Sequence, residues 1–493
     1  MENMNKIILF LLLASYAISA QENRSIHRLE HEYYSKHTQT TKPPAIPISL
    51  QKNNSTYTNN LNKIVFGFLP WWEYSAGAHH SIRYDLLTHI AISFFDSDGD
   101  GKITEPPYWP WNDLINKAKA NNVKLIMVVS NFNGDQLHKL FTNQTAKQNL
   151  LDNILAKMDS YGFDGVNIDF ENLLSGDEGS LLNGFMRSLT DFIKPKKPLS
   201  EISFDSPIVN SGGWNFKELA DACDYLFVMG YDFYGSWSLT TGPSSPLIGN
   251  SYGLTYSLNN FYSSVSPEKL ILGVPYYGNY WKTSSKVSYA NVTPYDSTKA
   301  KNNWVKPALR YKEIIPQYSQ KKLMWDKVSQ TSWLCWEQNG IWNQIWYDSD
   351  SSLGLKYELA LTKSLKGIGI WALGYDEGRT ELWNLIEKKF AKTTSVNENV
   401  ASIPGRFELY QNYPNPFNPG TVISYQLSAK SYVQLKIFDL LGREVASLVN
   451  EEQTAGIYNS TFSTLRSALT SGVYIYSLKV NGFIQSKKMI FLK

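Results

Sequence analysis

Cysteine is scarce in this chain of 493 residues, and no long apolar run occurs beyond its N-terminus. The two cysteines, Cys223 and Cys335, are too few for a disulfide framework. No cluster of Cys and His has the spacing of metal ligands, so neither a metal nor another cofactor is expected. No stretch after the N-terminus is long and apolar enough to cross a membrane.

An excess of charge of one sign is also lacking. The 47 basic and 44 acidic residues leave a net charge of +3, and no basic stripe suggests nucleic acid as a partner. Aromatic residues, in contrast, make up 14% of the chain and include 15 Trp. Aromatic faces stack on the apolar faces of sugars, but most Trp side chains belong to cores, so composition alone does not decide the function.

The first twenty residues have the pattern of an export signal. Lys6 precedes a short apolar run over residues 7–14, and small residues follow at Ala17, Ser19 and Ala20. The run is too short to span a bilayer, which predicts a cleaved signal peptide over residues 1–20. Residues 21–60 are polar and contain several prolines, so we expect a leader or linker that buries little apolar surface.

Residues 61–390 alternate apolar strand patterns with helical patterns. The eight expected strands cover residues 63–69, 87–95, 123–130, 163–171, 201–204, 225–231, 269–276 and 367–373. Near-continuous apolar strands separated by helices are typical of a parallel sheet covered on its outer face. The pattern therefore predicts an α/β fold, a (β/α)8 TIM barrel.

Two further parts interrupt or follow this pattern. Residues 279–366, between the seventh and eighth strands, exceed one crossover helix and predict a small α+β insertion. Its many Trp and Tyr residues either pack its own core or form a wall beside a substrate groove. After a polar linker over residues 391–404, residues 405–493 show short alternating strands and predict a separate β-sandwich domain.

The fourth expected strand carries the most informative stretch of the chain. Side chains alternate along a strand, so Asn167, Asp169 and Glu171 share one face, and the apolar residues between them share the other. Neighbouring carboxyls disfavour each other's ionisation, and burial adds to the effect. The stretch predicts a carboxyl with a raised pKa, which is common in acid–base catalysis.

Other polar and aromatic residues end neighbouring strands. Tyr231 and Asp232 end the sixth, Tyr276 and Tyr277 end the seventh, and Trp371 lies within the eighth. Reacting groups of parallel barrels lie at the carboxyl ends of the strands, so these residues are expected to converge with Glu171 on one mouth. His89 is interpreted as structural, whereas Trp71, Trp72 and Trp281 could either pack or stack on a substrate.

These motifs resemble glycoside hydrolase family 18, the chitinase-like hydrolases. The family pattern Asp-Gly-x-Asp-x-Asp-x-Glu is matched by Asp164, Gly165, Asp169 and Glu171, with Asn167 in place of the middle acid. The stretch from Met229 to Asp232 resembles the family's Met-x-Tyr-Asp, and residues 272–278 and 367–371 resemble its last two strands. The resemblance covers roughly residues 62–390.

The resemblance implies a retaining hydrolysis in which the substrate's own acetamido group is the nucleophile. Glu171 would be the general acid and base, Asp169 would orient the acetamido group, and Tyr231 would hydrogen-bond its oxygen. The implied substrate-binding residues are Asp232, Trp371, Met229, Asn167 and Tyr276. The substrate would be a β-1,4-linked glycan containing N-acetylglucosamine, as in chitin.

Asn167 is the departure from the family pattern. An amide cannot share a proton with Asp169, so we expect less like-charge repulsion and a different pH profile. Asn here is common in peptidoglycan- and spore-linked branches of the family, so peptidoglycan and N-glycans stay open as substrates. A non-catalytic chitin-binding lectin on the same fold is a further alternative, although such relatives typically lack the acid at Glu171. A purely structural surface protein is a third hypothesis, and a monomer is expected.

The C-terminal domain resembles the type A sorting domain of the type IX secretion system. The resemblance rests on residues 413–419 (Tyr-Pro-Asn-Pro-Phe-Asn-Pro), 433–439, 441–444, 469–477 and 488–493. It implies that the secretion machinery is a partner and that the protein passes through the periplasm and outer membrane. The protein is then expected to be secreted or held at the cell surface.

Overall fold

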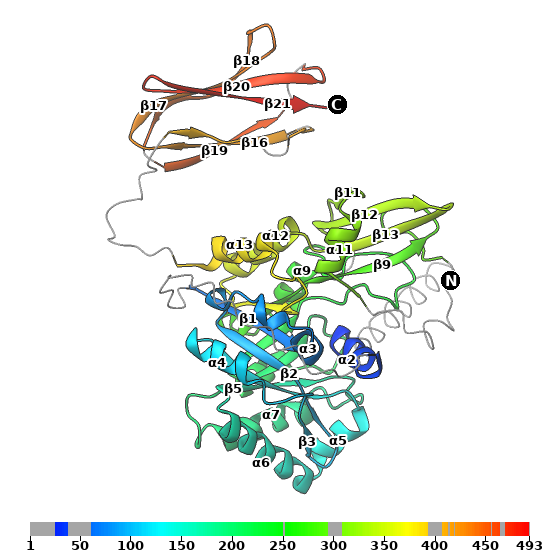
Figure 1. Cartoon of the computed structure of the whole chain (residues 1–493). Coiled ribbons are helices and arrows are strands. Elements are labelled where there is room, and N and C mark those ends of the chain that lie inside the picture. The colour runs from blue at the N-terminus through cyan, green and yellow to red at the C-terminus, as the bar shows by residue number, and fades with distance from the viewer. Residues whose placement is uncertain are drawn as a thin grey trace, which may run out of the picture. The chain divides into compact units, whose positions relative to one another are not determined.

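The chain divides into two units, Met1–Lys392 and Thr393–Lys493 (Figure 1). The computed structural model describes residues 25–37, 61–249, 252–293, 308–392, 407–412, 415–418, 420–454, 456–463 and 469–492. The predicted signal peptide lies outside these residues, so it stays a prediction. Within the described ranges, no helix combines the length and apolar character that crossing a bilayer requires.

The first unit is built on a closed parallel barrel, which confirms the predicted fold. Each strand pairs in parallel with the next, and the last strand pairs with the first. The barrel strands are β1 (Ile64–Pro70), β2 (His89–Ser97), β4 (Lys124–Asn131), β5 (Gly165–Phe170), β6 (Glu201–Pro207), β7 (Tyr225–Met229), β8 (Leu270–Pro275) and β14 (Gly367–Trp371). A short strand, β3 (Ile103–Thr104), pairs antiparallel with β2.

Helices connect these strands and cover the barrel. They are α3 (Trp71–Ser75), α4 (Asn112–Ala120), α5 (Gly134–Thr142), α6 (Gln144–Tyr161), α7 (Ser180–Ile193), α8 (Phe216–Ala222), α9 (Leu254–Asn260), α12 (Asp350–Thr362) and α13 (Thr380–Phe390), with 3-10 turns at Ala78–His80, Tyr84–Leu86 and Pro267–Lys269. The helix before the central strand has defined ends. Asn143 accepts from the Ala146 N–H at the start of α6, and Gly162 ends the helix at φ 68°.

The outer face of β5 anchors that strand in the core. Val166 and Ile168 are fully buried, and Phe170 packs against Phe141 of α5 and Phe185 of α7. The opposite face, which carries the carboxylates, must therefore point into the barrel, because a strand alternates its side chains. Apolar packing on one side thus fixes the direction of the polar residues on the other.

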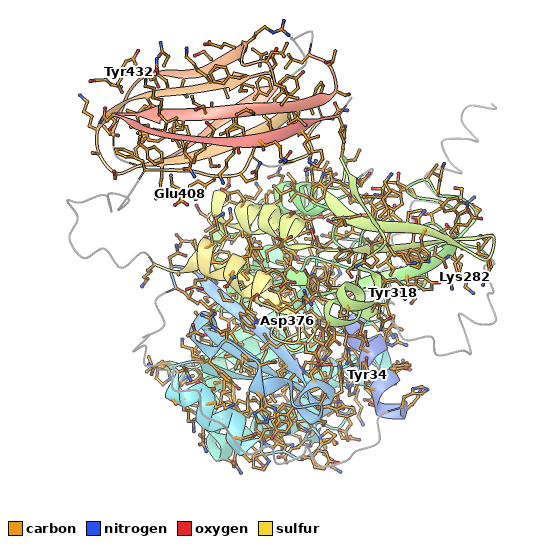
Figure 2. All side chains as sticks on the ribbon, turned by 45° about the horizontal axis from the view of Figure 1, so that its top comes forward. Tyr34, Lys282, Tyr318, Asp376, Glu408 and Tyr432 are labelled. Atoms are coloured by element: carbon orange, nitrogen blue, oxygen red, sulfur yellow. The ribbon has the colours of Figure 1, made fainter. Side chains whose placement is uncertain are left out.

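In its described residues, the predicted insertion between the seventh and eighth barrel strands forms an antiparallel sheet that the helix α11 (Tyr311–Tyr318) accompanies. The strands of this sheet are β9 (Tyr277–Thr283), β10 (Leu309–Arg310), β11 (Lys322–Asp326), β12 (Thr331–Gln338) and β13 (Ile341–Tyr347). Trp281, Trp333 and Trp346 pack together as a small core of this module. Trp281 is therefore a packing residue, and Lys282 beside it lies toward the outer end of the sheet (Figure 2).

The second unit consists of antiparallel strands, as predicted for a β-sandwich. One sheet has the order β15-β16-β19 and the other β18-β17-β20-β21. The strands are β15 (Glu408–Leu409), β16 (Gly420–Leu427), β17 (Ser431–Phe438), β18 (Glu444–Gln453), β19 (Gly456–Ser463), β20 (Gly472–Val480) and β21 (Phe483–Phe491). Alternate apolar residues of both sheets, such as Ile423, Leu435 and Leu478, are fully buried in its own core.

A helix near the N-terminus, α2 (Ile26–His37), differs from the expectation for residues 21–60. It lies against the barrel close to α3 (Figure 1). Ile26, His27, Glu30 and Tyr34 are buried, although this region was expected to bury little. Ile26, Glu30 and Tyr34 are four residues apart, so they fall on one face of the helix and can be buried together.

Candidate active site

The strand β5 brings the predicted carboxyl groups to the mouth of the barrel. Asn167 and Asp169 are fully buried, and Glu171, directly after the strand, is 7% exposed. The Asn167 amide donates to Ser203 Oγ at 3.1 Å and to Asp205 Oδ1 at 2.9 Å on β6. The polar face of β5 is therefore held against the polar end of the next barrel strand.

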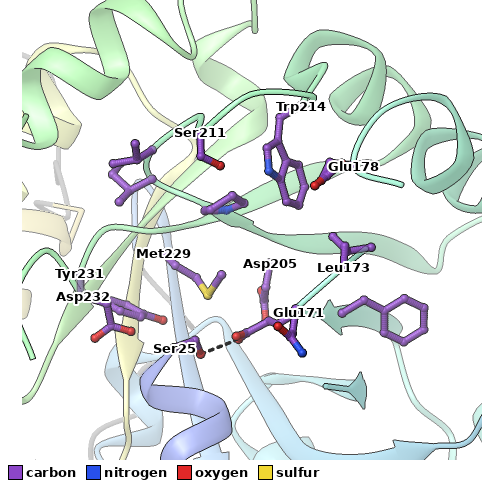
Figure 3. A pocket seen from close by; sticks show the side chains of 15 residues that line it. Ser25, Glu171, Leu173, Glu178, Asp205, Ser211, Trp214, Met229, Tyr231 and Asp232 are labelled. Atoms are coloured by element: carbon purple, nitrogen blue, oxygen red, sulfur yellow. Dashed lines mark hydrogen bonds between the residues drawn. The ribbon is translucent and has the colours of Figure 1, made fainter. Parts of the chain in front are cut away.

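Glu171 directly follows β5 and lines a pocket at the barrel mouth. The Ser25 hydroxyl donates to its Oε1 at 2.7 Å (Figure 3). Burial, and next the charge of Asp169, raise the pKa of Glu171 to about 8. A carboxyl with this pKa carries a proton at neutral pH, which is the form that a general acid requires.

Asp169 precedes Glu171 by two residues, so it lies on the same face of the strand and deeper in the barrel. Burial raises its pKa to about 7. Its Oδ2 is 3.1 Å from His27 Nδ1, and Tyr231 places its hydroxyl 2.7 Å from His27 Nε2. Burial lowers the pKa of His27 to about 4, so the imidazole is neutral at pH 7. A neutral imidazole has one N–H, and both contacts are satisfied when Nδ1 donates to Asp169 and Nε2 accepts from Tyr231.

Asp232 and Tyr231 follow β7 and line the same pocket as Glu171 and Met229 (Figure 3). Asp232 accepts from the Tyr277 hydroxyl at 2.6 Å and from the Ile26 backbone N–H at 2.7 Å. Burial raises the pKa of Asp232 to about 7. The end of β7, the sixth barrel strand, therefore places a hydroxyl and a carboxyl beside the acids of β5. The sequence predicts this arrangement.

Trp371, at the end of β14, forms an apolar wall of the site. Its ring stacks on His27 with 3.7 Å between ring centroids, and its Nε1 donates to Glu30 Oε2 at 2.9 Å. Trp72 lies nearby and stacks on Tyr34 at 4.7 Å. Trp72 is therefore at the barrel mouth, where the sequence left packing and stacking open.

Tyr276 is the one predicted site residue that the structure directs away from this cluster. Its hydroxyl lies 3.1 Å from that of Tyr357 on α12. The next residue, Tyr277, makes the contact with Asp232 instead. The sequence named both tyrosines at the end of the seventh strand, and the pleat of the chain decides which of them faces the barrel. The predicted role of Tyr276 in substrate binding gains no support from this position.

Sequence reasoning missed Asp205, which lies on β6 beyond the end predicted for that strand. Burial, and next the charge of Asp169, raise the pKa of Asp205 well above its usual range. Oxygens of both carboxyls and a ring nitrogen of His27 lie within 4.8 Å of one another. Oδ1 of Asp169 and Oδ2 of Asp205 are buried and make no hydrogen bond to the described residues. Two such carboxyls cannot both ionise readily, so the charge of one disfavours ionisation of the other.

Sequence reasoning also missed the contributions of α2 and of the residue that precedes it. Ser25, Ile26, His27 and Glu30 all contact residues of the site. A usable signal was present, since His27 and His31 are one helical turn apart and Ile26, Glu30 and Tyr34 repeat every fourth residue. The polar composition around them concealed it.

Two groups of the described residues have the spacing of metal ligands. One is His27, Asp169 and Asp205, and the other is His79, His80 and Asp113. Hydrogen bonds already engage both ring nitrogens of His27, and His79 Nε2 lies 2.7 Å from Asp113 Oδ2. These contacts account for both groups without an ion, and the absence of a metal cofactor stays a prediction.

The fold and the site together define a class of protein, the (β/α)8 barrel enzymes. Paired acids lie at the carboxyl end of the fourth barrel strand, and aromatic side chains surround them. Residues 33–376 match Glycosyl hydrolases family 18, and the chain belongs to this family. Residues 411–492 match the secretion system C-terminal sorting domain, which indicates type IX secretion and export to the surface or the medium. The sequence-based recognition of both parts is confirmed.

Two curated relatives are similar over about half of the chain. Human di-N-acetylchitobiase is 30% identical over 258 residues, covering 46% of this chain and 64% of that protein. The putative sporulation-specific glycosylase YdhD of Bacillus subtilis is 25% identical over 258 residues, covering 50% of this chain and 56% of that protein. The chain thus spans less than two thirds of the length of these relatives.

A solved chitinase shares the fold of the first unit. The family 18 chitinase of Cycas revoluta, in complex with (GlcNAc)3, superposes with a TM-score of 0.58 and 20% sequence identity. The superposition covers 66% of this chain and 99% of the chitinase. At this identity the likeness describes the barrel architecture alone.

Proposed function

We propose that this protein is a secreted hydrolase that cleaves β-1,4 bonds in glycans containing N-acetylglucosamine. The observation that carries the proposal is the proximity of Glu171, Asp169, Tyr231 and Trp371 at one barrel mouth, where His27 contacts or approaches all four. The match to the family and the similarity to a chitobiase support this proposal.

In the proposed mechanism the protonated Glu171 donates to the glycosidic oxygen as the bond breaks. The acetamido oxygen of the sugar attacks the anomeric carbon and forms an oxazolinium ion, so the protein supplies no nucleophile. Glu171, now a carboxylate, takes a proton from the water that opens this ring and is regenerated. The configuration at the anomeric carbon is retained.

The other residues hold and stabilise the reacting sugar. Asp169 accepts from the acetamido N–H and offsets the positive charge that develops on that group. Tyr231 donates to the acetamido oxygen and aims it at the anomeric carbon. Trp371 is the apolar floor under the ring, and Asp232 hydrogen-bonds the sugar.

Asp205 is proposed to replace the acid that Asn167 lacks. It reaches the site from the neighbouring strand, is hydrogen-bonded to Asn167, and lies close to Asp169. A protonated Asp205 would let Asp169 carry a negative charge, and an ionised Asp205 would favour the protonated form of Asp169. Asp205 does not touch the sugar, so it is a positioning residue that acts through Asp169.

The test is Glu171→Gln, which keeps the shape of the side chain and removes the acid. Hydrolysis of chitin oligosaccharides should fall roughly 10²- to 10⁴-fold. Glu358→Gln on α12, an exposed carboxyl in a surface ion pair with Lys389, is the matched control. The chain is assayed after a specific protease has cut it within residues 38–60. The cut is needed because α2 and Ser25 contact Glu171, Asp169 and Tyr231. Equal turnover by Glu171→Gln and the unsubstituted chain would contradict the assignment.

Peptidoglycan is the second candidate substrate. Asn167 and the similarity to a protein named as a sporulation-specific glycosylase favour it. A panel of chitin oligosaccharides, peptidoglycan fragments, N-glycans and de-N-acetylated chitin separates the candidates, with product anomers read by NMR. Net retention is expected on N-acetylated substrates, and equal turnover of the de-N-acetylated polymer would contradict the mechanism.

A further inference from the structure

The segment Ser25–His37 occupies the place where the proposed mechanism puts a sugar. Each proposed catalytic residue is engaged by it: Glu171 by Ser25, and both Asp169 and Tyr231 by His27. Asp232 accepts from the backbone of Ile26, and Trp371 is covered by the His27 ring. A glycan could not reach these groups while the segment is bound.

His27 offers the site the same hydrogen-bonding pattern as an acetamido group. An acetamido group has one N–H donor and one carbonyl acceptor. His27 donates at Nδ1 toward Asp169 and accepts at Nε2 from Tyr231, on the two residues assigned to the acetamido group. Its ring also lies on the Trp371 face, at 3.7 Å and 24° between planes, as a sugar ring would.

The rest of α2 holds this residue in position. Glu30 is fully buried and accepts from Trp371 Nε1 at 2.9 Å and from the Tyr375 hydroxyl at 2.6 Å. Tyr34 stacks on Trp72, and the Arg310 guanidinium lies over its ring at 4.8 Å. A buried carboxyl with two donors and a sandwiched aromatic ring are features of a specific docking site.

Little free space is left beside the acids. The pocket lined by Ser25, Glu171, Met229 and Tyr231 has a volume of about 70 Å³ (Figure 3). Sites for small organic ligands measure roughly 300–1,000 Å³. With α2 bound, the pocket beside Glu171 is therefore too small for a sugar unit.

We propose that residues 25–37 are an intramolecular inhibitor, which we name the plug, and that it keeps this hydrolase latent by imitating an N-acetylated sugar. This proposal rests on the proposed function, because that function identifies the blocked site as the one that binds the glycan. The plug and the glycan bind the same residues, so they are mutually exclusive. Removal of the plug opens the groups that carry out hydrolysis.

The main experiment places a recognition sequence for a specific protease within residues 38–60 of the full chain. The protein folds intact, is cut, and is diluted before assay on a fluorogenic N-acetylchitooligoside. A plug that occupies the site in about 99 of 100 molecules lowers the rate about 100-fold, so a rise of that size is expected after cutting. A synthetic peptide with the sequence of residues 25–37 should then inhibit competitively.

Point variants test the plug without cutting the chain. His27→Ala removes the imitated acetamido contacts, and Glu30→Ala removes the acceptor for Trp371 and Tyr375, so each should raise the activity of the uncut chain at least about tenfold. Ser35→Ala on the exposed side of the same helix is the matched control and should leave it unchanged. Unaltered activity in both plug variants would overturn the proposal.

Two readouts separate failure of the plug from failure of the proposed function. Equal activity before and after cutting overturns latency and leaves the hydrolase assignment intact. Inactivity of the cut chain on every N-acetylated glycan contradicts the hydrolase assignment. In that case, a fluorescently labelled peptide with the sequence of residues 25–37 tests the plug proposal through its binding to the cut chain. Saturable binding that His27→Ala in the peptide weakens supports the proposal, and no binding overturns it.

Discussion

At the scale of single residues, the site depends on acids that are buried close together. Asp169 and Asp205 lie on neighbouring strands, and Asn167 donates to Asp205 while contributing no charge. Because residue 167 is an amide, Asp205 of β6 can lie beside Asp169 without a third carboxyl in the cluster. This arrangement makes the proton balance of the pair sensitive to residue 205.

Asp205→Asn should keep the hydrogen bond to Asn167 but remove the second acid of the pair. Asp169 then ionises at lower pH, because a neighbouring acid no longer opposes its charge. We expect kcat to fall roughly tenfold or more and the acidic limb of the pH profile to move to lower pH. The double variant Asn167→Asp with Asp205→Asn returns an acid to the pair and should recover part of the rate. A lower kcat with an unmoved pH profile would reduce Asp205 to a structural role.

Tyr276 and Tyr277 form a matched pair, because they are adjacent but contact different partners. Tyr277→Phe removes the donor to Asp232 and should raise KM for N-acetylated oligosaccharides roughly tenfold. Tyr276→Phe removes only the contact with Tyr357 and should cost about 1 kcal/mol of unfolding free energy while activity is kept. Kinetics and chemical denaturation of both variants check this, and loss of binding in Tyr276→Phe would restore its predicted role.

The sequence predicted most of these residues because each ends an apolar strand. Asp169, Glu171, Tyr231 and Trp371 meet at one mouth, as their strand positions require. Asp205 was missed because β6 runs to Pro207, past the predicted end at residue 204. The sequence also did not distinguish Tyr276 from Tyr277, since the direction of a side chain at a strand end depends on local pleat and twist.

At the scale of elements, β5 is fixed by close contact with its neighbour. A Cβ at Gly165 would lie 2.4 Å from the Glu201 backbone oxygen, so any side chain must push β5 and β6 apart. The strand that carries the acids can therefore approach β6 only with glycine at this position.

Gly165→Ala should destabilise the first unit by roughly 2–4 kcal/mol through this overlap. Gly184→Ala in α7 is the matched control, since nothing lies within 4 Å of its added Cβ. That change should instead stabilise by about 0.5–1 kcal/mol through helix propensity. Urea unfolding followed by Trp fluorescence measures both, and equal effects of the two changes would contradict the packing argument.

The helix α2 is the element that sequence reasoning expected least. Its composition is polar, and its buried residues include a histidine and a glutamate; a glutamate is rarely buried without partners. Both are buried because the barrel mouth supplies partners for them. Such burial depends on residues distant in the sequence, so local composition could not predict it.

At the scale of the whole molecule, stability is coupled to the protons held at the barrel mouth. Burial raises the pKa of Glu171 to about 8 and that of Asp232 to about 7, so the folded state binds more protons than the unfolded chain. Stability from these groups is complete below pH 4 and is lost as pH rises toward 8. His27 acts oppositely: its pKa is lowered to about 4, and its contribution is lost as pH falls from about 6.5 to 4.

Between pH 7.5 and 8.5 the carboxyls dominate this balance, because His27 is neutral in the folded state and almost entirely neutral in the unfolded state. The melting temperature of the first unit should therefore fall across this range, with each group contributing up to about 1.4 kcal/mol per pH unit. Glu171→Gln removes one titrating group and should make the fall shallower. Calorimetry at constant ionic strength measures this, and a melting temperature that rises with pH would contradict the carboxyl assignment.

The connection of α2 to β1 through residues 38–60 gives the plug a high effective concentration. Linkage within one chain can hold a bound segment at about millimolar local concentration. A peptide with a dissociation constant of only about 10 µM would then be bound roughly a hundredfold more often than free. After a single cut, the plug would dissociate and be diluted outside the cell. A segment that binds only weakly would then switch the activity on irreversibly.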